Sequence, residues 1–164
     1  MLDQSRKRLQ DRYLSLGLGE LAAAAVFVAV AVGVVMPRLD GPHASAALWS
    51  ALVPLLVVLA QAGVYWLLAR RWVEQAPMPA VLAKFYRVFR VLDAVVLTVG
   101  LLGVVTWLPD HLGAAVGIVA LWVFGVVEYV NYFVVRLAYP LRRWPFMVGL
   151  WRTPRLVQDL NSAR

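Results

Sequence analysis

Residues 21–36 read LAAAAVFVAVAVGVVM, a run without a charged or hydrogen-bonding side chain. Extended back to Leu14, the run is long enough to cross a bilayer as a helix, which requires about 20 residues at ~1.5 Å rise per residue. Three similar runs follow, at residues 47–69, 88–108 and 112–136. The sequence therefore predicts an all-α integral membrane protein with four transmembrane helices, the first spanning residues 14–36.

The composition supports this fold class. The chain of 164 residues is 62% hydrophobic and 15% charged, which leaves too little polar surface to cover a soluble globule. It has no cysteine, which excludes disulfides, thiolate nucleophiles and cysteine metal sites. Of the basic residues, only Lys7 and Lys84 are lysine and the rest are arginine, a usage typical of GC-rich bacterial genomes.

The connections and the basic residues predict the topology. Turn-forming sequences separate the apolar runs: RLDGPHASA at 38–46, EQAPMPA at 74–80 and LPDHLG at 108–113. Short connections favour an up-down-up-down bundle in a single membrane domain. Fifteen of the sixteen basic residues lie in the N-terminal arm, in the second connection with the start of the third helix, and from Arg136 onward. The positive-inside rule then predicts that both termini are cytoplasmic, in a multi-pass protein of the bacterial inner membrane.

The net charge of +7 is split among these three juxtamembrane segments. We therefore expect the basic residues to meet anionic lipids at the cytoplasmic face, and we expect no nucleic-acid partner. In the tail, residues 137–164, RRWPFMVGLWRTPRLVQDL at 142–160 mixes arginine with aromatic residues, as is typical of amphipathic segments at the lipid surface. Thr153 and Pro154 predict the start of a short helix through Leu160. A docking surface for a partner protein is the alternative for this tail.

Polar side chains within the apolar runs are the candidate functional residues, because burying an ionisable group in lipid costs at least ~2.5–3.5 kcal/mol. Counted from the middle of each run at ~1.5 Å per residue, the acids lie ~6–8 Å from the midplane, on the cytoplasmic side. Each run contributes to this polar layer. Its predicted members are Glu20, Gln61, Tyr65, Asp93, Glu128, Asn131 and Tyr132.

Neighbouring residues refine the prediction. Arg90 lies one turn from Asp93 and is its expected counter-ion, with Arg87 as a further candidate. Gly17, one turn before Glu20, would allow a close approach between helices. The GxxxG sequence GAAVG at 113–117 predicts another close helix contact, within the bundle or between copies.

Three roles remain open for the polar layer. It can hold the helices together through hydrogen bonds, bind a cation or relay protons, or bind a lipid headgroup or partner. Burial and neighbouring negative charge both favour a neutral carboxyl group, so we expect at least one of the acids to hold its proton near neutral pH.

The two short connections at the other face carry ligand-type residues. Asp40, His43, Asp110 and His111 could bind zinc or a similar ion, although their spacing matches no specific metal motif. Ordinary loop polarity is the preferred explanation for these four residues, and a metal site is the alternative. With no other histidine in the chain, a haem held by axial imidazoles and a histidine-based di-iron site are disfavoured, and we predict no cofactor.

The end of the fourth run, EYVNYFVVRLAYP at 128–140, resembles that of small uncharacterised four-helix membrane proteins, mostly from actinobacteria. The resemblance covers this EYxNYF motif and the general layout. It implies no activity or cofactor, and it places Glu128, Asn131 and Tyr132 among the residues worth mutating.

Three functions are consistent with these patterns. The first is a structural or accessory membrane subunit that assembles with itself or with a larger complex. The second is a small proton- or cation-coupled transporter that uses the intramembrane carboxylates. The third is a membrane enzyme acting on lipid with the same carboxylates as general acid and base, the least favoured reading because no catalytic motif is present.

Overall fold

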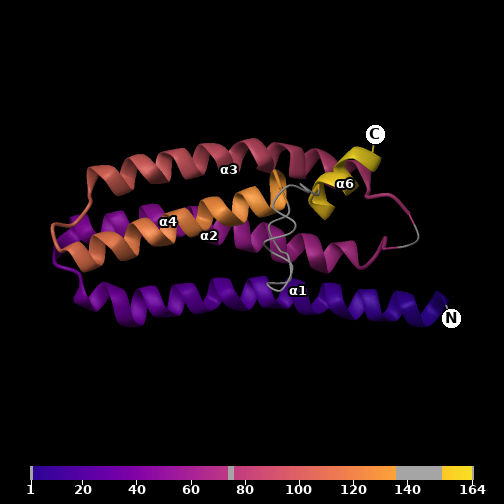
Figure 1. The fold of residues 1–164 in the computed structure, drawn as a ribbon, viewed down its shortest axis with the longest axis horizontal. Coiled ribbons are helices and arrows are strands. Elements are labelled where there is room, and N and C mark those ends of the chain that lie inside the picture. The colour runs from indigo at the N-terminus through magenta and orange to yellow at the C-terminus, as the bar shows by residue number, and fades with distance from the viewer. Residues whose placement is uncertain (1, 74–75, 136–152, 164) are drawn as a thin grey trace, which may run out of the picture.

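The computed structural model describes residues 2–73, 76–135 and 153–163. Four long helices pack as a bundle: α1 (Leu2–Val30), α2 (Gly41–Ala69), α3 (Ala80–Thr106) and α4 (Leu112–Phe133) (Figure 1). A short helix, α6 (Arg155–Ser162), lies at one end. Each long helix is long and apolar enough to cross a membrane. The prediction of an all-α bundle with four membrane-spanning helices is confirmed.

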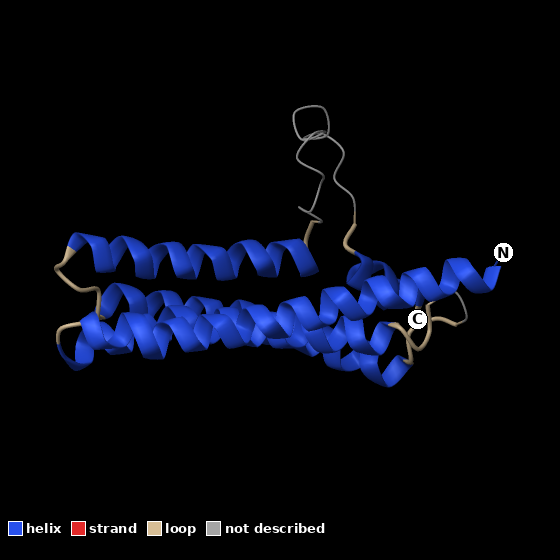
Figure 2. Cartoon of the chain, turned by 90° about the horizontal axis from the view of Figure 1, so that it is seen from below, coloured by secondary structure: helices blue, strands red, loops and turns tan. Residues whose placement is uncertain are grey.

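The chain enters and leaves the bundle at the same end (Figure 2). We call this the terminal end. At the opposite, loop end, short connections join α1 to α2 and α3 to α4. Consecutive helices therefore run in opposite directions.

α1, α2 and α3 are longer than the apolar runs that predicted them, whereas α4 ends at Phe133, before the predicted end at residue 136. α1 begins at Leu2, within the basic arm, and α3 begins at Ala80, before the first charged residue of that helix. Hydropathy marks the part of a helix that lies in lipid, whereas backbone hydrogen bonds continue beyond it. At its other end α1 passes into a π-helical turn (Ala31–Val35) and a 3₁₀ turn (Met36–Arg38). Pro37, which has no N–H to donate, lies in that last turn.

α2 is the central helix of the bundle. It packs on α1, α3 and α4, whereas α1 packs mainly on α2. Half of the most apolar window of α2 is buried inside the molecule, against 6% of that of α1. The remaining apolar surface of α1, α3 and α4 is available to lipid.

Glycines set the close contacts of α2. A Cβ atom on Gly17 would lie 2.8 Å from Leu67 Cγ and 2.9 Å from the Gly63 carbonyl oxygen. A Cβ atom on Gly100 of α3 would lie 2.5 Å from the Ser50 carbonyl oxygen, which Pro54 leaves without its usual helical donor. The close approach predicted for Gly17 is therefore present, and α1 and α3 both contact α2 through small residues.

α6 packs against α3 and α4 at the terminal end. Leu156 and Leu160 are only 2% and 5% exposed, so the apolar face of this helix contacts protein. The interfacial role expected for the tail therefore does not extend to this face. The helix begins at Arg155, with Pro154 at the N-cap position in place of the predicted Thr153. The rest of the predicted interfacial tail, residues 137–152, lies outside the described residues.

Candidate functional site

The predicted polar layer is divided by α2 into two separate groups. Glu20 and Glu128 lie on the side where α1 faces α4, and both line the same pocket. Asp93 lies on the other side, where α3 packs on α2, and is hydrogen-bonded to Gln61. The three acids therefore do not form one site.

The first group lines a pocket of about 300 Å³ between α1 and α4, which we call the acid pocket. Two side-chain contacts cross from α1 to α4 beside it. On the loop side, the rings of Phe27 and Phe124 lie 5.8 Å apart. On the terminal side, the Tyr132 hydroxyl donates to Glu20 Oε1 and accepts from Trp66 Nε1, which lies 3.2 Å away. The Glu20 carboxylate is thus linked to α2 through one tyrosine.

Glu128 has its own partner on the same helix. Asn131, one turn along α4, hydrogen-bonds to the Glu128 carboxylate, and the charges of Glu20 and Glu128 are close enough to interact. Both acids are half-buried. The acid pocket is also lined by Ser15 and by apolar residues of α1, α2 and α4. Two carboxylates in a largely apolar pocket match a small cation or a basic side chain.

A second, apolar pocket of about 450 Å³, which we call the outer pocket, lies between the same two helices at the loop end. Gly113, Ala114 and Gly117 of the GAAVG sequence line it. A Cβ atom on Gly117 would meet nothing within 4 Å. A Cβ atom on Gly113 would meet only the His111 side chain at the start of the same helix, so the close helix contact predicted for GAAVG within the bundle is wrong.

The second group joins α2 and α3. Asp93 is 1% exposed, and its Oδ1 accepts a hydrogen bond of 2.9 Å from Gln61 Nε2. The Tyr86 hydroxyl donates to the Gln61 carbonyl oxygen at 3.0 Å. The expected Asp93–Arg90 pair does not form, because Arg90 is exposed and the carboxyl group of Asp93 turns towards α2. Arg87 instead donates to the carbonyl oxygen of Leu160 in α6, at 2.9 Å.

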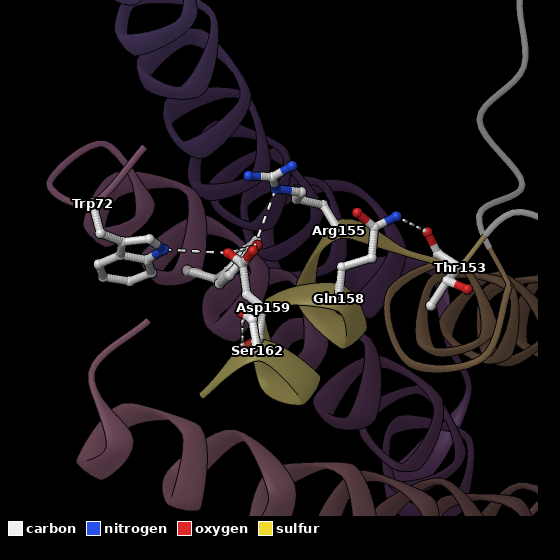
Figure 3. Close-up of polar contacts among 7 residues, drawn as sticks. Trp72, Thr153, Arg155, Gln158, Asp159 and Ser162 are labelled. Carbon is white, nitrogen blue, oxygen red and sulfur yellow. Dashed lines mark hydrogen bonds and ion pairs between the residues drawn. The ribbon is translucent and has the colours of Figure 1, made fainter. Parts of the chain in front are cut away.

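Tyr65 belongs to neither group. Its hydroxyl donates to Asp159 Oδ2 of α6 at 2.8 Å, and Trp72 Nε1 donates to the same oxygen at 3.2 Å. Arg155 Nε lies 3.3 Å from Asp159 Oδ1 (Figure 3). Asp159 was not among the predicted residues. The spacing of Leu156, Asp159 and Leu160, which places all three on one helix face, is the pattern that identifies it.

The loop-end residues do not form a metal site. Among the described residues, which include Asp40, His43, Asp110 and His111, no three histidine, cysteine or acidic side chains lie close enough to hold a metal ion. His111 has a structural role, since its Nδ1 accepts from the Ala114 backbone N–H at 3.4 Å and caps α4.

Comparison with known proteins finds no matching protein family, no similar characterised sequence and no similar solved structure. The predicted resemblance therefore gains support only in its general layout of four long apolar helices. On fold and hydropathy, the chain is a multi-pass membrane protein.

Proposed function

We propose that the chain is a structural or accessory subunit of the bacterial inner membrane, oriented with both termini in the cytoplasm. The observation that carries the proposal is that predicted polar residues form hydrogen bonds from one helix to another. Tyr132 joins α4 to α1 and α2, Gln61 joins α2 to α3, and Tyr65 joins α2 to α6. Interhelical hydrogen bonds of this kind average ~0.6 kcal/mol each in membranes, so the set stabilises the bundle modestly.

The surface between α1 and α4 is the proposed assembly surface. The outer pocket presents the small residues of GAAVG, which favour close helix packing, and the acid pocket beside it would accept a basic side chain. The occupant we propose is a transmembrane helix of another membrane protein that carries a lysine or arginine. Anionic lipids would contact the basic residues at the terminal end.

Site-directed photocrosslinking in native membranes tests this proposal. The chain has no cysteine, so a photoreactive probe can be attached to a single introduced one. We expect Gly117→Cys, which opens into the outer pocket, to give an adduct with another polypeptide. Val32→Cys is the control, since Val32 is 50% exposed but lines neither pocket.

The adduct's mass separates the possible partners. An adduct of twice the chain mass would show that the partner is a second copy of the chain and not the proposed membrane protein. Recovery of the free protein alone from Gly117→Cys, or equal adducts from both positions, would contradict the proposed assembly surface.

A second candidate, a cation carrier, is favoured by the acid pocket itself. Its volume of about 300 Å³ and its paired carboxylates suit a small organic cation. In liposomes containing the purified protein, a carrier would exchange tetramethylammonium for protons, and Glu128→Gln would reduce this flux at least tenfold. Asp93→Asn is the control, because it removes a carboxylate outside the pocket. Flux that is absent, or is unchanged by Glu128→Gln, eliminates the carrier.

A further inference from the structure

The Asp93–Gln61 pair has two buried oxygen atoms without hydrogen-bond partners among the described residues. Gln61 Nε2 donates to Asp93 Oδ1, while Asp93 Oδ2 and Gln61 Oε1 are both buried and accept no hydrogen bond from the part of the chain that the structure describes. Buried polar groups in folded proteins are almost always paired. An ionised carboxylate and an amide oxygen are both acceptors, so these two atoms cannot satisfy each other as they stand.

The surrounding residues do not supply the missing donors. The Tyr86 hydroxyl is directed to the Gln61 backbone oxygen, and the Tyr129 hydroxyl of α4 donates to the Arg90 backbone oxygen at 3.0 Å. Arg87 donates to α6, where Arg155 contacts Asp159. The Arg90 side chain is exposed. The remaining ionisable groups near this level are also engaged elsewhere: Tyr65 bonds to Asp159, Tyr132 bonds to Glu20, and Glu128 lines the acid pocket.

One proton satisfies both atoms. We infer that Asp93 and Gln61 form a proton-binding site, in which Asp93 Oδ2 carries a proton and donates it to Gln61 Oε1. The two side chains then form a cyclic acid–amide pair with two opposed hydrogen bonds. No net charge is buried, which explains why a membrane-spanning aspartate that is 1% exposed has no basic partner among the described residues.

The inference goes beyond the proposed function and does not depend on it. The pair lies on the α3 side of α2, away from the acid pocket, so it holds whether the chain is a subunit or a carrier. It also identifies Asp93 as an intramembrane acid that is neutral. Glu20 and Glu128 remain the carboxylates that face a pocket.

Infrared spectroscopy of the full chain in lipid bilayers at neutral pH tests the inference. We expect the C=O stretching band of a protonated carboxylic acid, which shifts when aspartate alone is labelled with carbon-13. The band should disappear in Asp93→Asn and persist in Glu20→Gln and Glu128→Gln. Asp93→Asn should fold normally, because the asparagine amide can donate to Gln61 Oε1 in place of the acid proton.

Two results would overturn the inference. One is a wild-type spectrum in which no protonated band responds to aspartate labelling. The other is a protonated-acid band that responds to aspartate labelling and survives in Asp93→Asn. The labelling experiment uses the wild-type chain, so it shows whether an aspartate is protonated even if Asp93→Asn misfolds. In Gln61→Leu the aspartate band should shift to higher frequency, because its carbonyl oxygen loses the hydrogen bond from Gln61 Nε2.

Discussion

Replacing Gly17 with leucine should separate α1 from α2 and cause a large loss of stability. The new Cβ atom would lie 2.8 Å from Leu67 Cγ and 2.9 Å from the Gly63 carbonyl oxygen, and a backbone oxygen cannot move aside as a flexible side chain can. The contact is reciprocal, since a Cβ atom on Gly63 would lie 2.8 Å from Leu21 Cγ. Overpacking of this kind costs about 1–3 kcal/mol or more. Thermal unfolding of the purified protein in detergent would measure the loss.

Gly19→Leu is the matched control for this prediction. Gly19 lies two residues further along α1, and a Cβ atom there would meet nothing within 4 Å. Both variants change the same residue type in the same helix, so their helix propensities change equally. We expect Gly17→Leu to unfold at a clearly lower temperature than Gly19→Leu. Equal unfolding temperatures would mean that α1 does not approach α2 as described.

Replacing Asp159 with alanine should release α6 from the terminal end of the bundle. The change leaves the Tyr65 hydroxyl and Trp72 Nε1 without their shared acceptor, and an unsatisfied buried donor costs about 1–3 kcal/mol. The cost of two such donors is a large share of the stability that an eight-residue helix can gain by packing on the bundle. Hydrogen exchange measured by mass spectrometry should show faster exchange in α6, with little change in the loop-end half of α2.

Two further variants on α6 separate this effect from a general weakening of the helix. Gln158→Ala removes an exposed side chain whose one bond among the described residues is to the Thr153 carbonyl oxygen, and exchange in α6 should stay close to that of the wild type. Asp159→Asn keeps one acceptor oxygen and should lie between wild type and Asp159→Ala. If α6 exchanges no faster in Asp159→Ala than in Gln158→Ala, the Asp159 contacts do not hold the helix in place.

The number of long helices and their order could be predicted from the sequence, because each apolar run is set by the thickness of the bilayer. The starts of α1 and α3 could not, since a helix continues through charged residues once its backbone hydrogen bonds are established. The charged side chains in this part of α1 are unfavourable in lipid but favourable in a helix in water, as for Arg6, Lys7 and Arg12. Hydropathy therefore underestimates the length of α1.

The polar layer was predicted in height better than in direction. Counting residues along each run placed Gln61 near the level of Asp93, and these two side chains are hydrogen-bonded in the structure. Tyr132 was included because it shares a helix face with Glu128, and it bonds to Glu20. The same counting could not show that these pairs lie on opposite sides of α2. The direction of a side chain around its helix depends on how the helices rotate against one another, which packing at Gly17 and Gly100 decides.

Asp159 could not be found by a search restricted to the membrane-spanning runs. Its role depends on Tyr65 and Trp72, which are more than eighty residues away in the chain. The spacing of Leu156 and Leu160 predicts an amphipathic helix but does not distinguish lipid from protein as its partner. The partner of this helix can be identified only in the folded chain, where α6 lies against Tyr65 and Trp72.

The central position of α2 has a consequence for how the chain can be assembled during synthesis. All the close glycine contacts of α1 are made with α2, so a nascent chain that has released only its first 69 residues already contains that helix hairpin. α3 and α4 can then add to the remaining faces of α2 as they leave the ribosome, in keeping with folding from the N-terminus. α6 can bind only last, because Arg87 of α3 forms part of its binding surface.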